Sequence, residues 1–101
     1  MTTPAVLTPT SGAFNLSVGT TTGRQILPTT GSPTILALTN LSIGNGSLIY
    51  ATLGDVTSVA SVGQSLVIVP GQTVYVAIGT NTYIAAIATS APATLNVTPS
   101  T

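Results

Sequence analysis

Residues 34–53 read TILALTNLSIGNGSLIYATL and hold the clearest strand signal in the chain. Aliphatic and β-branched residues fill both halves of this stretch, and an Asn-Gly pair at 45–46 separates the halves. Asn-Gly is the preferred pair of a two-residue hairpin turn because both residues tolerate positive φ. We therefore predict a hairpin whose strands are residues 34–44 and 47–53. Both faces of this hairpin carry apolar side chains, which favours a central position, covered by a second sheet or by another subunit.

The rest of the chain predicts further short strands separated by turns, and no helix. The ten Val, eight Ile and twenty Thr residues favour a pleated surface, and recurring Gly and Pro interrupt any long helix. Besides the hairpin and a short extended piece at 25–27, the predicted strands cover residues 13–18, 56–62, 65–69, 72–78, 82–88 and 93–97. Seven or eight short strands joined by turns predict an all-β fold, a small antiparallel β-sandwich of jelly-roll or Ig-like type.

Two of these strands, residues 72–78 and 82–88, flank a turn at 79–81 and predict a second hairpin. If its loop has three residues, one face of the pair carries the apolar side chains of Val74, Val76, Ile78, Ile84 and Ala86. Tyr75 and Tyr83 then lie diagonally on the opposite face, within reach of each other. A two-residue loop turns one strand over relative to the other, so both registers stay open.

The composition changes near residue 33, which suggests two parts. Residues 1–33 hold four of the seven prolines and nine of the twenty threonines. This density of Pro, Gly and Thr favours an extended N-terminal arm that contains short strands. Residues 34–101 then form the β-sandwich domain, with Leu95 and Val97 of the last strand pointing inward. A trimeric β-prism or an intertwined barrel is the alternative architecture, because the arm is long enough to reach a neighbouring copy.

The charge inventory excludes most chemistry. Arg24 and Asp55 are the only charged side chains, and the chain has no His, Cys or Lys. Zinc sites, disulfides, a carboxylate pair and a base-activated Ser or Thr nucleophile therefore lack the residues that they need. A single arginine cannot neutralise several phosphates. We predict that the chain is not an enzyme, holds no metal or cofactor and binds no nucleic acid.

Membrane and secretory segments are not predicted either. The mean hydropathy is +0.63, yet the longest fully apolar run has only five residues, at 84–88. A membrane-spanning helix needs about 20 apolar residues. The first ten residues have neither the basic start nor the apolar core of a secretory signal. We therefore expect no membrane partner.

A neutral surface indicates that the chain works within an assembly. Charge normally keeps a free monomer in solution and prevents the edges of sheets from joining.

Asp55 follows a glycine and is interpreted as a turn former that bonds the backbone two residues on. Arg24 is either an interface contact or an exposed loop residue.

The aromatic residues complete the set of candidate interface positions. Tyrosines on an exposed sheet face can anchor a protein partner or stack on a sugar, whereas buried ones fill the core. Both interpretations stay open. The candidate interface residues are Phe14, Arg24, Tyr50, Tyr75 and Tyr83.

Asn40 opens one of four Asn-x-Ser/Thr triplets in the chain, the pattern of a glycosylation acceptor. In a sequence so rich in Ser and Thr, such triplets are expected by chance. We interpret all four as accidental.

From residue 34 onward the chain resembles the capsid decoration, or cement, proteins of tailed bacteriophages. The segments that carry this resemblance are Thr39-Asn40, ATLG at 51–54, VPGQTV at 69–74, YIAAI at 83–87 and ATLNVTP at 93–99. The resemblance implies a β-sandwich on the outer surface of the virion capsid. It also implies a homo-oligomer, often a trimer, that bridges subunits of the major capsid protein and stabilises the shell. The N-terminal arm would then reach a neighbour or the shell.

Two other functions remain as alternatives. The first is a tail-fibre or carbohydrate-binding β-module that holds its ligand through Tyr75, Tyr83 and nearby amides. The second is a surface or fibre protein that assembles with itself through uncharged edge strands.

Overall fold

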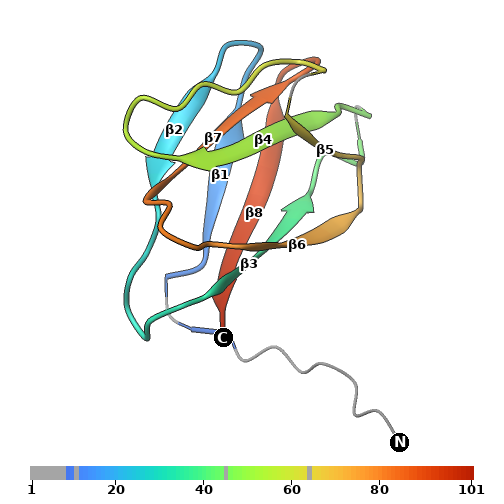
Figure 1. Ribbon diagram of the computed structural model, residues 1–101. Helices are drawn as coiled ribbons and strands as arrows, with labels where there is room; N and C mark the ends of the chain where they lie inside the picture. The colour runs from blue at the N-terminus through green and yellow to red at the C-terminus, as the bar shows by residue number, and fades with distance from the viewer. Residues whose placement is uncertain (1–8, 11, 45, 64) are drawn as a thin grey trace, which may run out of the picture.

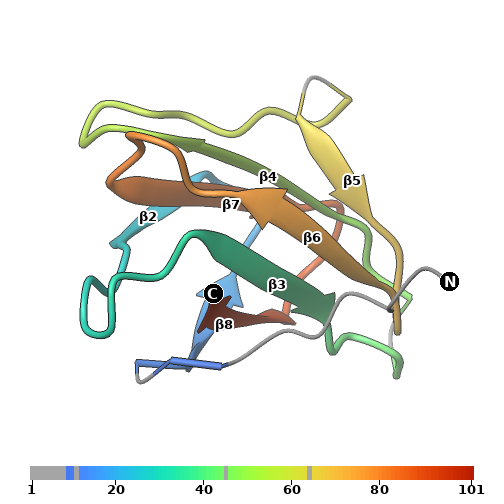
Figure 2. The same cartoon turned by 60° about the horizontal axis from the view of Figure 1, so that its bottom comes forward.

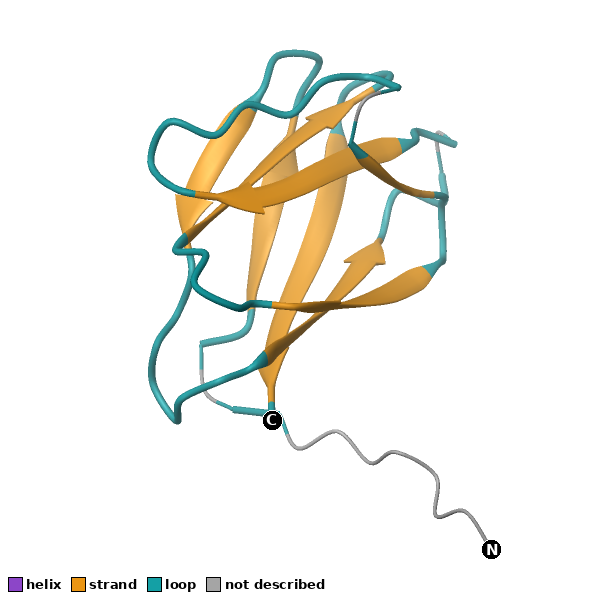
Figure 3. Cartoon of the chain, in the orientation of Figure 1, coloured by secondary structure: helices purple, strands orange, loops and turns teal. Residues whose placement is uncertain are grey.

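The computed structural model describes residues 9–101 except 11, 45 and 64. Within those residues the chain forms eight β-strands and no helix (Figure 1, Figure 3). The strands are β1 (Phe14–Val18), β2 (Gly23–Ile26), β3 (Ile35–Asn40), β4 (Ile49–Gly54), β5 (Leu66–Ile68), β6 (Thr73–Ala77), β7 (Tyr83–Ala88) and β8 (Ala93–Ser100). The prediction of an all-β fold with seven or eight short strands is confirmed.

The strands form two four-stranded antiparallel sheets, which lie as two layers in Figure 2. Sheet A has the order β1-β8-β3-β6 and sheet B the order β2-β7-β4-β5. Every connection crosses from one sheet to the other except that from β4 to β5. This order is that of an eight-stranded jelly roll. An Ig-like sandwich would instead keep several consecutive strands within one sheet.

The core lies between the sheets and is filled by every second residue of each strand, because side chains alternate between the two faces of a strand. Leu36 and Leu38 of β3 are buried, while Ala37 between them is half-buried. Leu95 and Val97 of β8 point inward, as predicted. That strand continues to Ser100, three residues beyond its predicted end.

The predicted hairpin over residues 34–53 is wrong, because β3 and β4 do not pair with each other. β3 lies in sheet A between β8 and β6, and β4 lies in sheet B between β7 and β5. Each strand pairs with a neighbour over all six of its residues, β3 with β8 and β4 with β7. This pairing places the apolar faces of β3 and β4 opposite each other across the core. Asn45, half of the predicted turn, lies outside the described residues.

The second predicted hairpin is wrong for the same reason. β6 pairs with β3 in sheet A, whereas β7 pairs with β2 and β4 in sheet B. The five apolar residues assigned to one hairpin face do all point into the core, but they approach it from opposite sheets. Tyr75 and Tyr83 therefore lie on opposite outer faces of the molecule.

One further strand prediction is wrong, and another is confirmed. Residues 56–62 form no strand in the described part of the chain, and belong to the connection between β4 and β5. The short strands expected within residues 1–33 are present as β1 and β2, and they form one edge of sheet A and of sheet B. The described part of this segment is thus built into the sandwich, and residues 1–8 lie outside the described residues.

A buried amide ties the two sheets together at one end of the sandwich. Asn40, the last residue of β3, is fully buried, and its Nδ2 donates to the carbonyls of Ser47 and Ile68, both at 2.8 Å. Its Oδ1 accepts from the backbone N–H of Ser42, also at 2.8 Å. Because Ser47 and Ile68 border strands of sheet B, the amide joins the end of sheet A to sheet B.

Two buried serines extend this contact to the start of β8 and to the connection that precedes it. The Oγ of Ser42 accepts from the backbone N–H of Thr94 at 2.9 Å. The Oγ of Ser47 accepts from the backbone N–H of Ser90 at 3.1 Å. We call Asn40, Ser42 and Ser47 the Asn40 cluster. The connections β3–β4, β5–β6 and β7–β8 all meet at this cluster.

Replacing Asn40 should destabilise the fold strongly. Asn40→Ala removes three hydrogen bonds to backbone groups in a buried part of the fold, and a buried polar group that loses its partner costs about 1–3 kcal/mol. We expect the free energy of unfolding to fall by about 3 kcal/mol or more, as measured by urea denaturation. Asn96→Ala is the control, since Asn96 bonds Asn15 and Thr98 on the half-exposed outer face of sheet A. Equal losses in the two variants would contradict this account.

Candidate interaction surfaces

The described residues contain no group of three or more His, Asp, Glu or Cys side chains that could hold a metal ion. They also contain no helix long and apolar enough to cross a membrane. The two charged side chains of the chain, Arg24 and Asp55, both take part in the β4–β5 connection: Asp55 is its first residue, and Arg24 contacts it from β2.

Asp55 forms the turn that the sequence predicted. Its Oδ1 accepts from the backbone N–H of Thr57 at 2.9 Å and from the Thr57 hydroxyl at 2.6 Å. These hydrogen bonds hold the pKa of the exposed Asp55 carboxyl below its usual value, and the positive charge of Arg24 contributes a smaller lowering. The carboxylate is therefore a structural acceptor that starts the long β4–β5 connection.

Arg24 lies in β2 and helps to hold this connection against the edge of sheet B. Its Nη1 donates to the carbonyl of Ser58 at 3.2 Å. Beside it, the backbone N–H of Ala60 donates to the hydroxyl of Thr22 at 2.9 Å, and Ala60 is buried. The same connection leaves three large apolar side chains more than half exposed, those of Val56, Val59 and Val62.

The free energy of unfolding should hardly depend on pH above the range in which the Asp55 carboxyl loses its proton. Folding lowers the pKa of Asp55, so the charged form favours the folded chain. That contribution is fully present above the ordinary aspartate pKa of about 3.9 and is lost as pH falls through the lowered value. Urea denaturation between about pH 2 and pH 7 should show loss of stability only at the acid end. Asp55→Asn should reduce that acid-side loss, and an NMR pKa at or above the ordinary value would contradict the assignment.

Removing the Arg24 guanidinium should loosen the β4–β5 connection while leaving the sandwich intact. Arg24→Met keeps the apolar stem and deletes the donor to Ser58. We expect faster hydrogen exchange at Ala60 and a change in unfolding free energy below about 1 kcal/mol, because an exposed hydrogen bond contributes little. Gln25→Met, at the next exposed position of β2, is the control. Identical exchange at Ala60 in both variants would show that Arg24 does not hold the connection.

The outer face of sheet B is mostly apolar. Val67, Tyr50 and Ile87 form one row across β5, β4 and β7, while Ile26 and Tyr83 form another across β2 and β7. Ile26 is 57% exposed and Val67 is 40% exposed. We call these five residues the apolar face. Arg24 pairs with Ala85 between these two rows, so its charged side chain points to the same outer face, beside the apolar face.

The outer face of sheet A is polar by comparison. Asn15, Asn96, Thr39 and Thr73 form a continuous row across its four strands. Neighbouring side chains at each end of the row are hydrogen-bonded to each other, the two asparagines at 2.9 Å and the two threonines at 2.7 Å. Tyr75, 62% exposed on β6, is the large aromatic residue of this face.

The five candidate interface residues do not form one site. Tyr50, Tyr83 and Arg24 point to the outer face of sheet B, where Arg24 contacts the β4–β5 connection, and Tyr75 lies on the opposite outer face. Phe14 points inward from β1 and packs, half-buried, against the core. The expected proximity of Tyr75 to Tyr83 is wrong, so these two rings cannot hold one sugar between them.

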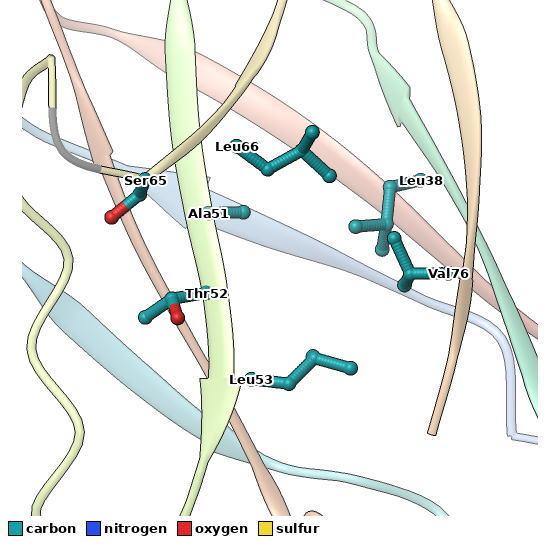
Figure 4. Close-up of a pocket in the computed structure, with 7 residues that line it drawn as sticks. All are labelled: Leu38, Ala51, Thr52, Leu53, Ser65, Leu66 and Val76. Atoms are coloured by element: carbon teal, nitrogen blue, oxygen red, sulfur yellow. The ribbon is translucent and has the colours of Figure 1, made fainter. Parts of the chain in front are cut away.

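An apolar groove opens between the sheets where β5 and β6 form their edges (Figure 4). Its volume is about 300 Å³, and its apolar lining consists of Leu38, Ala51, Leu53, Leu66 and Val76. Figure 4 shows that the hydroxyls of Thr52 and Ser65 point away from the leucine side chains. A second hollow of about 420 Å³ lies between residues 26–33 and 78–82.

Sequence reasoning missed both the groove and the Asn40 cluster. The groove depends on which edge strands meet across the two sheets, and the predicted hairpins paired those strands wrongly. Asn40 stood out only as part of a chance triplet and of the Thr39-Asn40 segment of the resemblance, and neither predicts its structural role. Its complete burial makes the side chain inaccessible to a glycan. No family model, curated protein or solved structure matches the chain.

Proposed function

We propose that this chain is a structural virion protein that binds the outer surface of a phage capsid and bridges major capsid subunits as a homo-oligomer. The observation that carries the proposal is the combination of a nearly uncharged chain with an apolar outer face on sheet B. Such a surface is suited to lasting contact with protein. The inventory of side chains offers no acid–base pair or activated nucleophile for a reaction.

The apolar face is the surface that we assign to the capsid. Full burial of one large aliphatic or aromatic side chain contributes about 1.5–3 kcal/mol, so a few of these residues supply a substantial part of a stable contact. The valines of the β4–β5 connection extend this apolar surface. An interface of this kind holds few ion pairs, and its strength should therefore depend little on salt.

Fold and resemblance support the same proposal at a coarser level. Eight-stranded jelly rolls occur among viral capsid and lectin domains, although a fold alone does not determine a function. The segments that resemble phage decoration proteins lie in β3, β4, β6, β7, β8 and the β5–β6 turn. The lectin-like alternative has lost its suggested site, because Tyr75 and Tyr83 lie on opposite faces.

Quantitative mass spectrometry of purified phage particles tests the proposal. We expect one copy of this chain, or a simple fraction of a copy, for each major capsid subunit. A few copies per particle would favour a tail or fibre protein. Complete absence from particles would refute the virion proposal.

A matched pair of variants tests the assigned face. Ile26→Asp and Tyr75→Asp each place a charge at a similarly exposed position on an edge strand, but on opposite outer faces. We expect Ile26→Asp to reduce binding to particles that lack the protein by at least about ten-fold, which corresponds to about 1.4 kcal/mol. Tyr75→Asp should bind as the parent does. The reverse result would move the capsid contact to sheet A.

A further inference from the structure

We propose that the apolar groove between β5 and β6 receives residues 5–7 of a second copy of this chain, Ala5-Val6-Leu7, as an added strand. The groove is lined by five apolar residues together with Thr52 and Ser65, and its mouth is formed by the half-exposed Leu66 of β5 and by Val76 of β6. Leu38 and Ala51 form its buried part. An occupant must therefore supply apolar side chains and satisfy the backbone of an edge strand.

β6 provides the backbone half of such a site. This strand pairs only with β3 among the described strands, and the N–H of Ile78 and the carbonyl of Gln72 both bond toward β3. In an antiparallel pair, successive residues direct their backbone groups alternately to the two sides. The N–H and C=O groups of Thr73, Tyr75 and Ala77 therefore point to the free edge. Addition of a strand to such an edge is a general mode of peptide recognition.

The N-terminal segment has the sequence that this site requires. Residues 1–8 read MTTPAVLT, and the apolar triplet at 5–7 lies between Pro4 and Pro9. The residue before a proline is restricted to extended backbone, so Thr3 and Thr8 favour an extended segment. An added strand that directs Ala5 and Leu7 into the groove buries two apolar side chains. The opposite orientation buries only Val6, so we assign Leu7 to the groove.

Chain length shows why the occupant comes from another copy. Pro9 is bridged to Ser100, and Ser100, Ile35 and Ala77 continue the same row to β6. Three strand spacings of about 4.8 Å place the β6 edge about 14 Å from Pro9. Leu7 reaches only about 7 Å from Pro9 even when the chain is fully extended. A second copy placed beside the first has no such limit, and chains without net charge do not repel each other as they approach.

This inference does not rest on the capsid proposal, and it is tested with purified protein alone. Sedimentation velocity over a range of concentrations should show oligomers for the parent chain and for Val6→Asp. Leu7→Asp, whose charge would enter the groove, should be monomeric. An equal effect of the two substitutions, or a parent chain that remains monomeric throughout, would overturn the proposal.

Cysteine cross-linking locates the contact, since the chain has no cysteine of its own. Leu7→Cys protein is mixed with Leu66→Cys protein and oxidised, and the control mixture uses Asn15→Cys on the far edge of sheet A. We expect the Leu7–Leu66 heterodimer to exceed the control by at least about ten-fold, because binding raises the local thiol concentration. A double variant should form linked multimers. Equal yields, or a disulfide within one chain of the double variant, would refute exchange between copies.

Discussion

The buried amide of Asn40 is the contact on which the crossing of the chain between its two sheets depends. All of its bonds go to backbone groups, so the side chain acts as a spacer of fixed length between segments that do not pair as strands. One of its partners lies 28 residues away, at the end of β5. In an interior of low polarity, a satisfied amide favours one arrangement because any shift leaves it unpaired. The contacts of a small core built from Leu, Ile, Val and Ala are not directional, so they specify the relative position of the two sheets less narrowly than these hydrogen bonds do.

The crossing of the chain creates two outer faces of different chemistry. Sheet A presents amides and hydroxyls, some of them bonded to one another across strands, and it resembles a hydrated protein surface. Sheet B presents tyrosine and aliphatic side chains together with Arg24, and the β4–β5 connection beside it adds three exposed valines. A chain of this kind has little to keep it in solution by charge. Occupation of the apolar face by a partner, and of the groove by another copy, would remove both apolar surfaces from water.

Local sequence patterns predicted the strands better than their partners. Apolar and β-branched runs bounded by turn residues identified β1, β3, β4, β5, β6, β7 and β8, and the pattern of the last strand placed Leu95 and Val97 inward. The Asn-Gly pair and the turn at 79–81 have the same local chemistry whether a chain returns within one sheet or crosses to another. Whether the chain stays in one sheet or crosses to the other depends on contacts between residues far apart in the sequence, such as Ile68 and Asn40. A short stretch of sequence does not contain both partners. Residues 56–62 look like a strand by composition, yet they lie in a connection that Arg24 and Thr22 bond to through its backbone. The Asp55 turn was predictable because both of its partners belong to Thr57.

Cryo-electron microscopy of purified phage particles tests the central claim most directly, because it shows both where the chain sits and which face it uses. The account predicts jelly-roll density on the outer surface of the capsid, with the apolar face of sheet B toward the major capsid protein and sheet A toward solvent. Capsids that lack this density, or that carry it with sheet B facing solvent, would contradict the account.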